Sequence, residues 1–143
     1  MLKRMHPIAG CLGFAIILTF WLSTLGTELF GTVAAIVAVK ITIPWGFILL
    51  VPALAFTGAS GARMAGKSGD ARIAAKQSRM KIIAANGLLV LMPAAFYLAH
   101  LAAQLQFGGV FYAVQAVELL AGAVNLSLMA LNMRDGLRLA GRV

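Results

Sequence analysis

One strongly basic segment, residues 61–81, separates two long stretches of sequence that are apolar and almost free of charge. The segment holds half of the chain's 12 Lys and Arg residues and a single acid, Asp70. Soluble domains are roughly 45–50% apolar, whereas this chain is 62% hydrophobic and 11% charged. The sequence therefore predicts an integral membrane protein, organised around one polar loop.

The apolar stretches divide into helices, because lipid cannot satisfy a free backbone and the runs are too long for barrel strands. A membrane-spanning helix needs about 20 residues, and the chain offers four runs of that length. We expect an all-α, four-helix membrane bundle that forms a single domain over residues 1–143. The predicted helices cover residues 7–26, 32–61, 82–104 and 110–133, with a basic loop over residues 62–81.

Glycine and proline indicate where the helices turn or bend. Gly26 and Gly31 bracket a short polar stretch, which predicts a tight turn between the first two helices. Pro44 and Pro52 each remove a backbone hydrogen bond, so the sharpest kink is expected on the second helix. Within the basic loop, residues 73–80 are a candidate for a short helix that lies at the membrane interface.

The positive charges predict the orientation of the chain. Short loops rich in Lys and Arg stay in the cytoplasm. With four spans, both termini lie on the same side as the basic loop, and every Lys and Arg except Lys40 falls on that side. We therefore expect a multi-pass protein of the bacterial cytoplasmic (inner) membrane with cytoplasmic termini. The C-terminal residues that hold this end in the cytoplasm are Arg134, Arg138 and Arg142.

The net charge of +8 does not indicate nucleic-acid binding. Nucleic-acid binders gather their basic residues on a folded polar surface, whereas here these residues lie at the ends of apolar runs. Such positions favour contact with anionic lipid headgroups. The single cysteine, Cys11, excludes an internal disulfide and a cysteine-based metal cluster. We therefore expect membrane lipid and other membrane subunits, or further copies of this chain, as partners, with no metal and no nucleic acid.

Two polar stripes run along the predicted third and fourth helices, at spacings of three and four residues. Polar groups that faced hydrocarbon would stay unpaired, so both stripes are expected to face the bundle interior. The stripe on the third helix consists of Asn86, Pro93, Tyr97, His100 and Gln104. The stripe on the fourth helix consists of Tyr112, Gln115, Glu118, Gly122, Asn125, Met129 and Asn132.

Glu118 is the residue with the strongest functional signal. If it lay at the outer surface, only residues 119–133 would remain to cross the membrane before Arg134, which is fewer than the required 20 or so. Glu118 is therefore expected roughly 12 Å inside the outer end of its helix. Lys40 lies at the same approximate depth on the second helix, and it would either pair with Glu118 or extend towards the outer headgroups. If the two pair, we expect structural cross-bracing rather than catalysis. The predicted intramembrane polar cluster comprises Lys40, Tyr97, His100, Tyr112, Gln115, Glu118 and Asn125.

The two histidines are weak candidates for cofactor ligands. A haem b held between two histidines needs both at one membrane level, whereas His6 and His100 lie at opposite levels. A haem with one His and one Met ligand, such as His6 with Met80, stays an alternative, as does a quinone near His100 and Tyr97. The simpler interpretation of His100 is a hydrogen bond to Glu28 or to water.

Three functional hypotheses follow. The sequence contains no nucleophile–base pair, metal motif or phosphate-binding loop, so we do not expect an autonomous enzyme. The first hypothesis is an accessory or assembly subunit that packs against a larger membrane complex. The second is a small oligomeric transporter coupled to protons or ions through Glu118. In this respect the chain resembles the small multidrug-resistance transporters, which have four short helices and a membrane-embedded Glu, although in that family the Glu lies on the first helix. The third is a haem- or quinone-binding electron-transfer subunit.

Overall fold

The computed structural model describes residues 2–66 and 70–141, and all the regular secondary structure in them is helical. Lys67, which belongs to the predicted basic loop, and Arg142, which belongs to the predicted C-terminal anchor, lie outside the described residues. The helices are α1 (Leu2–Phe30), α2 (Val33–Ala65), α3 (Ala71–Asn86), η1 (Gly87–Leu91), α4 (Met92–Ala103) and α5 (Gly109–Leu139).

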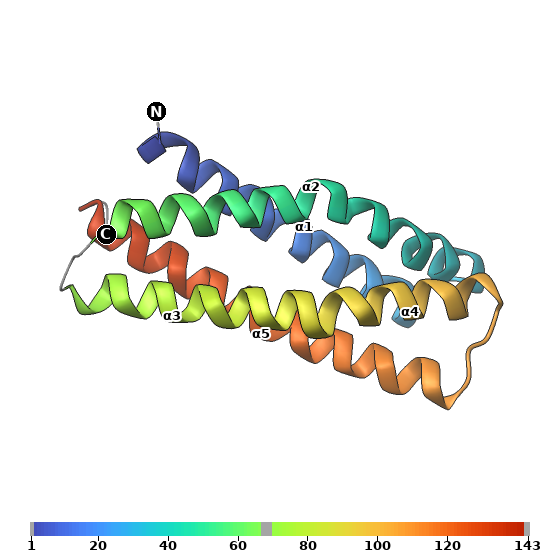
Figure 1. Cartoon of the computed structure of the whole chain (residues 1–143). Coiled ribbons are helices and arrows are strands. Elements are labelled where there is room, and N and C mark those ends of the chain that lie inside the picture. The colour runs from blue at the N-terminus through green and yellow to red at the C-terminus, as the bar shows by residue number, and fades with distance from the viewer. Residues whose placement is uncertain (1, 67–69, 142–143) are drawn as a thin grey trace.

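Four helical spans are long and apolar enough to cross a membrane, as the sequence predicts. α3, η1 and α4 form one of them, because the helix runs without a break from Ala71 to Ala103. Figure 1 shows that successive spans run in opposite directions, so the N- and C-terminal ends lie at the same end of the bundle. α1 and the α3–η1–α4 span each pack against both α2 and α5, which places α1 and this span on opposite sides of the bundle.

The connection between α1 and α2 is shorter than predicted. The expected turn over Gly26–Gly31 is instead the last part of α1, which continues to Phe30. Backbone groups inside a membrane must be paired, and this requirement favours extending the helix as far as possible. The chain turns at Gly31, where a Cβ atom would lie 2.6 Å from the carbonyl oxygen of Thr27. The Thr32 hydroxyl then caps α2 by accepting a hydrogen bond from the Ala35 amide.

The predicted basic loop over residues 62–81 is largely helical. α2 extends to Ala65, and α3 begins at Ala71 with the Asp70 carboxylate as its N-cap, 2.7 Å from the Arg72 amide nitrogen. The segment is rich in Ala, Arg, Lys and Gln, which favour helix, and aspartate is a strong N-cap. Residues 73–80 therefore do not form a separate helix at the interface but continue directly into the third span.

The proline-containing spans differ in how they accommodate proline. α2 stays continuous through Pro44 and Pro52, and Figure 1 shows it changing direction along its length. The third span instead widens into the five-residue π-helical turn η1 just before Pro93. Proline has no N–H and its ring collides with the carbonyl four residues earlier, at Leu89, so a wider turn relieves the conflict.

Two apolar clusters fill the bundle, one towards each end. The cluster near the α4–α5 connection contains Ile36, Leu98, Leu101, Ala102 and Phe111. The cluster nearer the termini contains Ile17, Leu50, Ile83 and Met129. Along both α2 and α5, the positions between these two clusters carry the buried charges described next.

Candidate functional site

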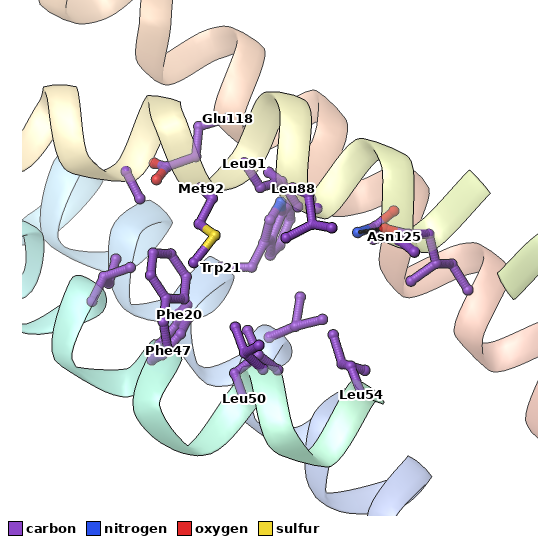
Figure 2. Close-up of a pocket in the computed structure, with 18 of the residues that line it drawn as sticks. Phe20, Trp21, Phe47, Leu50, Leu54, Leu88, Leu91, Met92, Glu118 and Asn125 are labelled. Carbon is purple, nitrogen blue, oxygen red and sulfur yellow. Dashed lines mark hydrogen bonds between the residues drawn. The ribbon is translucent and has the colours of Figure 1, made fainter. Parts of the chain in front are cut away.

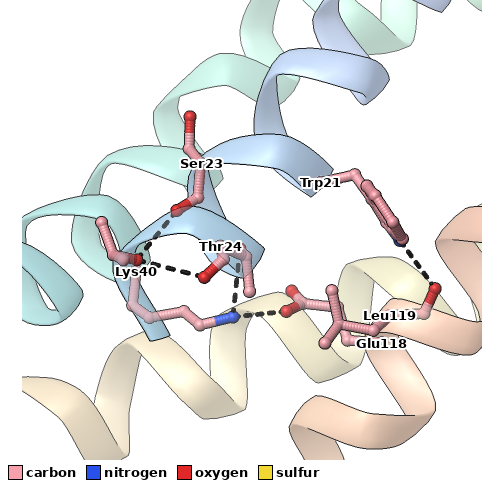
Figure 3. Close-up of polar contacts among 7 residues, drawn as sticks. Trp21, Ser23, Thr24, Lys40, Glu118 and Leu119 are labelled. Atoms are coloured by element: carbon pink, nitrogen blue, oxygen red, sulfur yellow. Dashed lines mark hydrogen bonds and ion pairs between the residues drawn. The ribbon is translucent and has the colours of Figure 1, made fainter. Parts of the chain in front are cut away.

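A buried ion pair joins three helices between the two apolar clusters. Lys40 on α2 contacts the Glu118 carboxylate on α5, and its ammonium group also lies 3.4 Å from the Thr24 hydroxyl on α1 (Figure 3). Lys40 is only 1% exposed and Glu118 is 9% exposed. Of the two alternatives for Lys40, the structure has the pair rather than a side chain extended towards the surface. The two charges neutralise each other and tie α1, α2 and α5 together.

A second polar contact, between two amides, joins α3 to α5. The Asn86 side-chain amide donates to the Asn125 side-chain oxygen at 2.8 Å and to the Ala121 carbonyl at 2.9 Å. The Asn125 amide in turn donates to the Ile83 carbonyl at 3.3 Å. Asn125 is 1% exposed, so its bond to the Ile83 carbonyl is shielded from competing water.

The polar stripe predicted for the third span does not continue past Asn86. Pro93, Tyr97, His100 and Gln104 are all exposed. The π turn holds one extra residue, which rotates everything after it by about 100° relative to a regular α-helix. Ala94, Leu98 and Leu101, each one residue later than a predicted position, are buried instead, together with Ala95 and Ala102.

The stripe on α5 faces the interior over most of its length. Gln115, Glu118, Gly122, Asn125 and Met129 are all buried. Tyr112 is the exception among the predicted site residues, since it is 50% exposed. Phe111 takes the interior position at this end, in edge-to-face contact with Phe107 at 4.9 Å between ring centroids.

Two oxygens near this ion pair have no hydrogen-bond partner among the described residues. They are the side-chain oxygen of Gln115, which precedes Glu118 by about one helical turn, and Oε1 of Glu28 on α1. His100 does not bond to Glu28, because its Nε2 lies 3.1 Å from the Gln104 amide nitrogen instead. Buried acceptors are usually paired with protein or ordered water, so this part of the bundle suits internal water.

A cavity of about 290 Å³ lies at the centre of the bundle and is lined by all four spans. Figure 2 shows Phe47, Leu50 and Leu54 facing Leu88, Leu91 and Met92 across it. Glu118 lies towards one end and Asn125 towards the other. The indole nitrogen of Trp21, which also lines the cavity, donates to the Leu119 carbonyl at 2.9 Å. The wall is almost entirely apolar.

The end of the bundle that holds the termini is basic and partly cross-linked by charge. Arg79 on α3 lies 2.6 Å from Asp135 on α5, and Arg134 lies 3.5 Å from the other oxygen of the same carboxylate. His6 on α1 shares a hydrogen bond of 2.8 Å with the Ser60 hydroxyl on α2. Asp135 is not among the predicted site residues, although a lone acid among C-terminal arginines is a signal for such a pair.

The histidines lie at opposite ends of the bundle. His6 packs against Gly61, and Met80, its proposed partner on a haem, packs against Gly58. His100 and Tyr97 are exposed on α4, away from the cavity lining. Within residues 2–66 and 70–141, no group of three or more His, Cys, Asp or Glu residues is placed to hold a metal ion.

No family model, curated protein or solved structure matches this chain.

Proposed function

We propose that this chain is a non-catalytic accessory subunit that packs against other proteins inside the bacterial cytoplasmic membrane, with both termini in the cytoplasm. The observation that carries the proposal is the use of its buried polar groups. Lys40, Glu118, Asn86 and Asn125 are each engaged in a contact between two helices. Side chains committed in this way stabilise a scaffold and leave no free catalytic pair.

The shortness of the connections supports the same proposal. Only Gly31 and Thr32 connect α1 to α2, and residues 104–108 connect α4 to α5. At the end of the bundle formed by these two connections, a protein partner would be met mainly through the lipid-facing surface. The basic end supports a cytoplasmic orientation because positive residues stay on that side.

Exposed aromatic side chains favour the α2–α4 face as the surface for the partner. Trp45 on α2 is 70% exposed, and Phe96 and Tyr97 on α4 are 54% and 45% exposed. These two helices pack together, and the Phe47 and Phe96 ring centroids are 5.8 Å apart. Aromatic residues are enriched at protein interfaces, where they contribute much of the binding energy.

Site-specific photocrosslinking in native membranes tests the proposal. A photoreactive phenylalanine analogue at Phe96 is expected to give a discrete protein adduct. Leu120 on α5, which is 71% exposed, is the matched control position and is expected to give lipid adducts only. An adduct with the mass of two chains would identify the partner as a second copy. Lipid adducts alone at both positions, together with a monomer in mild detergent, would refute an accessory role.

A second candidate, a proton- or ion-coupled transporter, is favoured by one specific observation. Glu118 forms part of the cavity wall, and Gln115 adds an unpaired buried oxygen one turn away. Proton flux into vesicles that contain the purified protein is expected to fall in Glu118→Gln and to persist in Tyr112→Phe, which changes an exposed side chain. Equal flux in wild type and Glu118→Gln would remove this candidate. The haem or quinone site at Tyr97 and His100 has no comparable support, because both side chains are exposed.

A further inference from the structure

The central cavity offers almost no polar group to a ligand. Its polar side chains already have partners, since Trp21 donates to a backbone carbonyl and Asn125 bonds to Asn86 and to the Ile83 carbonyl. Glu118 is paired with Lys40. A ligand with a polar body would lose its hydrogen bonds to water on entry and regain few of them. The chemistry of the wall therefore selects hydrocarbon.

The mouth of the cavity opens sideways. Of all the residues that line it, only four are exposed, and they belong to α2 and to the facing α3–η1 segment. They are Val51, Ala55, Ala84 and Leu88. The opening therefore lies between these two elements, in the middle of the spans and away from both ends of the bundle. In a bilayer, the material in front of such an opening is lipid hydrocarbon.

The length and volume of the cavity suit a single lipid acyl chain. On α2 the lining extends from Ile43 to Gly58, which corresponds to roughly 22 Å along the helix axis. One leaflet of a bilayer contributes about half of the 30 Å hydrocarbon core. Drug-sized ligands occupy pockets of about 300–1,000 Å³, and this cavity of about 290 Å³ is at the lower limit. One extended acyl chain fits these limits better than a fused-ring ligand.

One lysine, Lys76, lies just beyond one end of the cavity. Gly58 and Met80 line that end, Lys76 precedes Met80 by about one turn, and His6 packs against Gly61 about one turn beyond Gly58. The Lys76 ammonium group forms no hydrogen bond or ion pair with any described residue. The nearest acid, Asp135, is already bonded to Arg79. A half-buried cation with spare donors favours an anionic group at this end.

We propose that the cavity holds one acyl chain of an anionic phospholipid, which enters between α2 and α3–η1 and brings its phosphate to Lys76. The acyl chain then runs past Trp21 towards the end of the cavity that holds Glu118 (Figure 2). Basic sites between membrane helices recognise lipid headgroups in this way. The inference is independent of the accessory role, since lipid can occupy the cavity whether or not a protein partner binds the α2–α4 face.

Tryptophan quenching by brominated lipid tests the proposal directly. The chain has two tryptophans, so Trp45→Phe leaves Trp21 as the only indole, inside the cavity. This variant is reconstituted into vesicles that contain phosphatidylglycerol or phosphatidylcholine with bromine in the distal half of one chain. We expect saturable quenching of Trp21, stronger for the anionic lipid, and stronger for distal than for proximal bromine.

Paired substitutions separate the cavity from general contact with lipid. Ala84→Phe narrows the mouth and is expected to abolish the saturable quenching, whereas Ala85→Phe, at the adjacent exposed position that does not line the cavity, leaves it unchanged. Lys76→Gln is expected to remove a roughly fivefold preference for the anionic lipid, and Lys81→Gln on the exposed surface is expected to keep it.

Three results would overturn the proposal. They are an unquenched Trp21 in both lipids, equal quenching in Ala84→Phe and Ala85→Phe, and equal quenching by the two lipids in the parent protein. Circular dichroism and unfolding midpoints of each variant establish that the comparison is made between folded proteins.

Discussion

Replacing Lys40 by methionine tests the central ion pair. The substitution removes the ammonium group and leaves the Glu118 carboxylate without its partner inside the bundle. Breaking a buried pair in this way costs about 3–5 kcal/mol, because one charge stays buried without compensation. We expect a loss of stability in this range.

The burial of both side chains explains why the expected loss of stability is that of a buried ion pair rather than of a surface pair. Lys40 is 1% exposed, and the Glu118 side chain is 11% exposed. Water therefore cannot replace the lost contact, as it would at the surface, where such pairs contribute about 0–1 kcal/mol. Lys40→Met also removes the donor to Thr24, whose hydroxyl lies 3.4 Å from the ammonium nitrogen.

The double substitution Lys40→Met, Glu118→Met gives the decisive comparison. Exchanging a whole buried pair for apolar side chains is often neutral, or stabilising by about 1–4 kcal/mol. The double variant is therefore expected to be more stable than Lys40→Met alone by at least about 3 kcal/mol. Unfolding in mixed micelles with increasing SDS, followed by circular dichroism, measures both. Lys81→Met, at an exposed position, serves as the control and is expected to stay within about 0.5 kcal/mol of wild type. A double variant that is no more stable than Lys40→Met alone would show that the two charges do not stabilise each other.

Three further predictions concern packing, the π turn and topology. Gly46→Ala places a Cβ atom 2.1 Å from the Phe20 ring and is expected to lower the free energy of unfolding by about 1–3 kcal/mol. In the same unfolding assay, Gly26→Ala meets no neighbour within 4 Å and is expected to stabilise α1 by about 0.5–1 kcal/mol. Deleting Leu89 shortens the π turn to an α turn without rotating α4, so the protein is expected to fold. Deleting Phe96 from the regular helix α4 rotates the adjoining segment and is expected to abolish folding, as judged by size-exclusion chromatography. If the Phe96 deletion folds and the Leu89 deletion does not, the π turn does not hold the extra residue. A C-terminal green fluorescent protein fusion is expected to fluoresce in a bacterial host, and a C-terminal alkaline phosphatase fusion is expected to be inactive; an active phosphatase would reverse the assigned orientation.

The sequence was sufficient to predict the fold class and the number of spans, because length and hydrophobicity decide both. Depth along a helix could also be predicted. Counting residues from the helix starts put Lys40 and Glu118 at one level, and the two side chains do meet. This inference depended only on the helical rise, which varies little between helices.

The side of the third span on which each side chain lies could not be predicted beyond Asn86. One added residue in η1 turned Tyr97 and His100 to the exposed surface and brought Leu98 inward. A π turn has no strong sequence signal beyond a nearby proline, and Pro44 and Pro52 are accommodated without one. The charge of residues 62–81 also predicts a longer loop than the structure has, because the Ala, Arg, Lys and Gln residues in this segment favour helix.

The sequence separation of the ion pair has a consequence for biosynthesis. Glu118 follows Lys40 by 78 residues, so at roughly 5–20 residues per second the lysine is synthesised about 4–16 s before its carboxylate. Thr24 precedes Lys40 in the chain, and it is the contact available to the ammonium group while the nascent α1–α2 hairpin waits in the bilayer. Release of a chain truncated before α5 would therefore leave a lone charge among apolar helices, a state that cellular quality control can recognise.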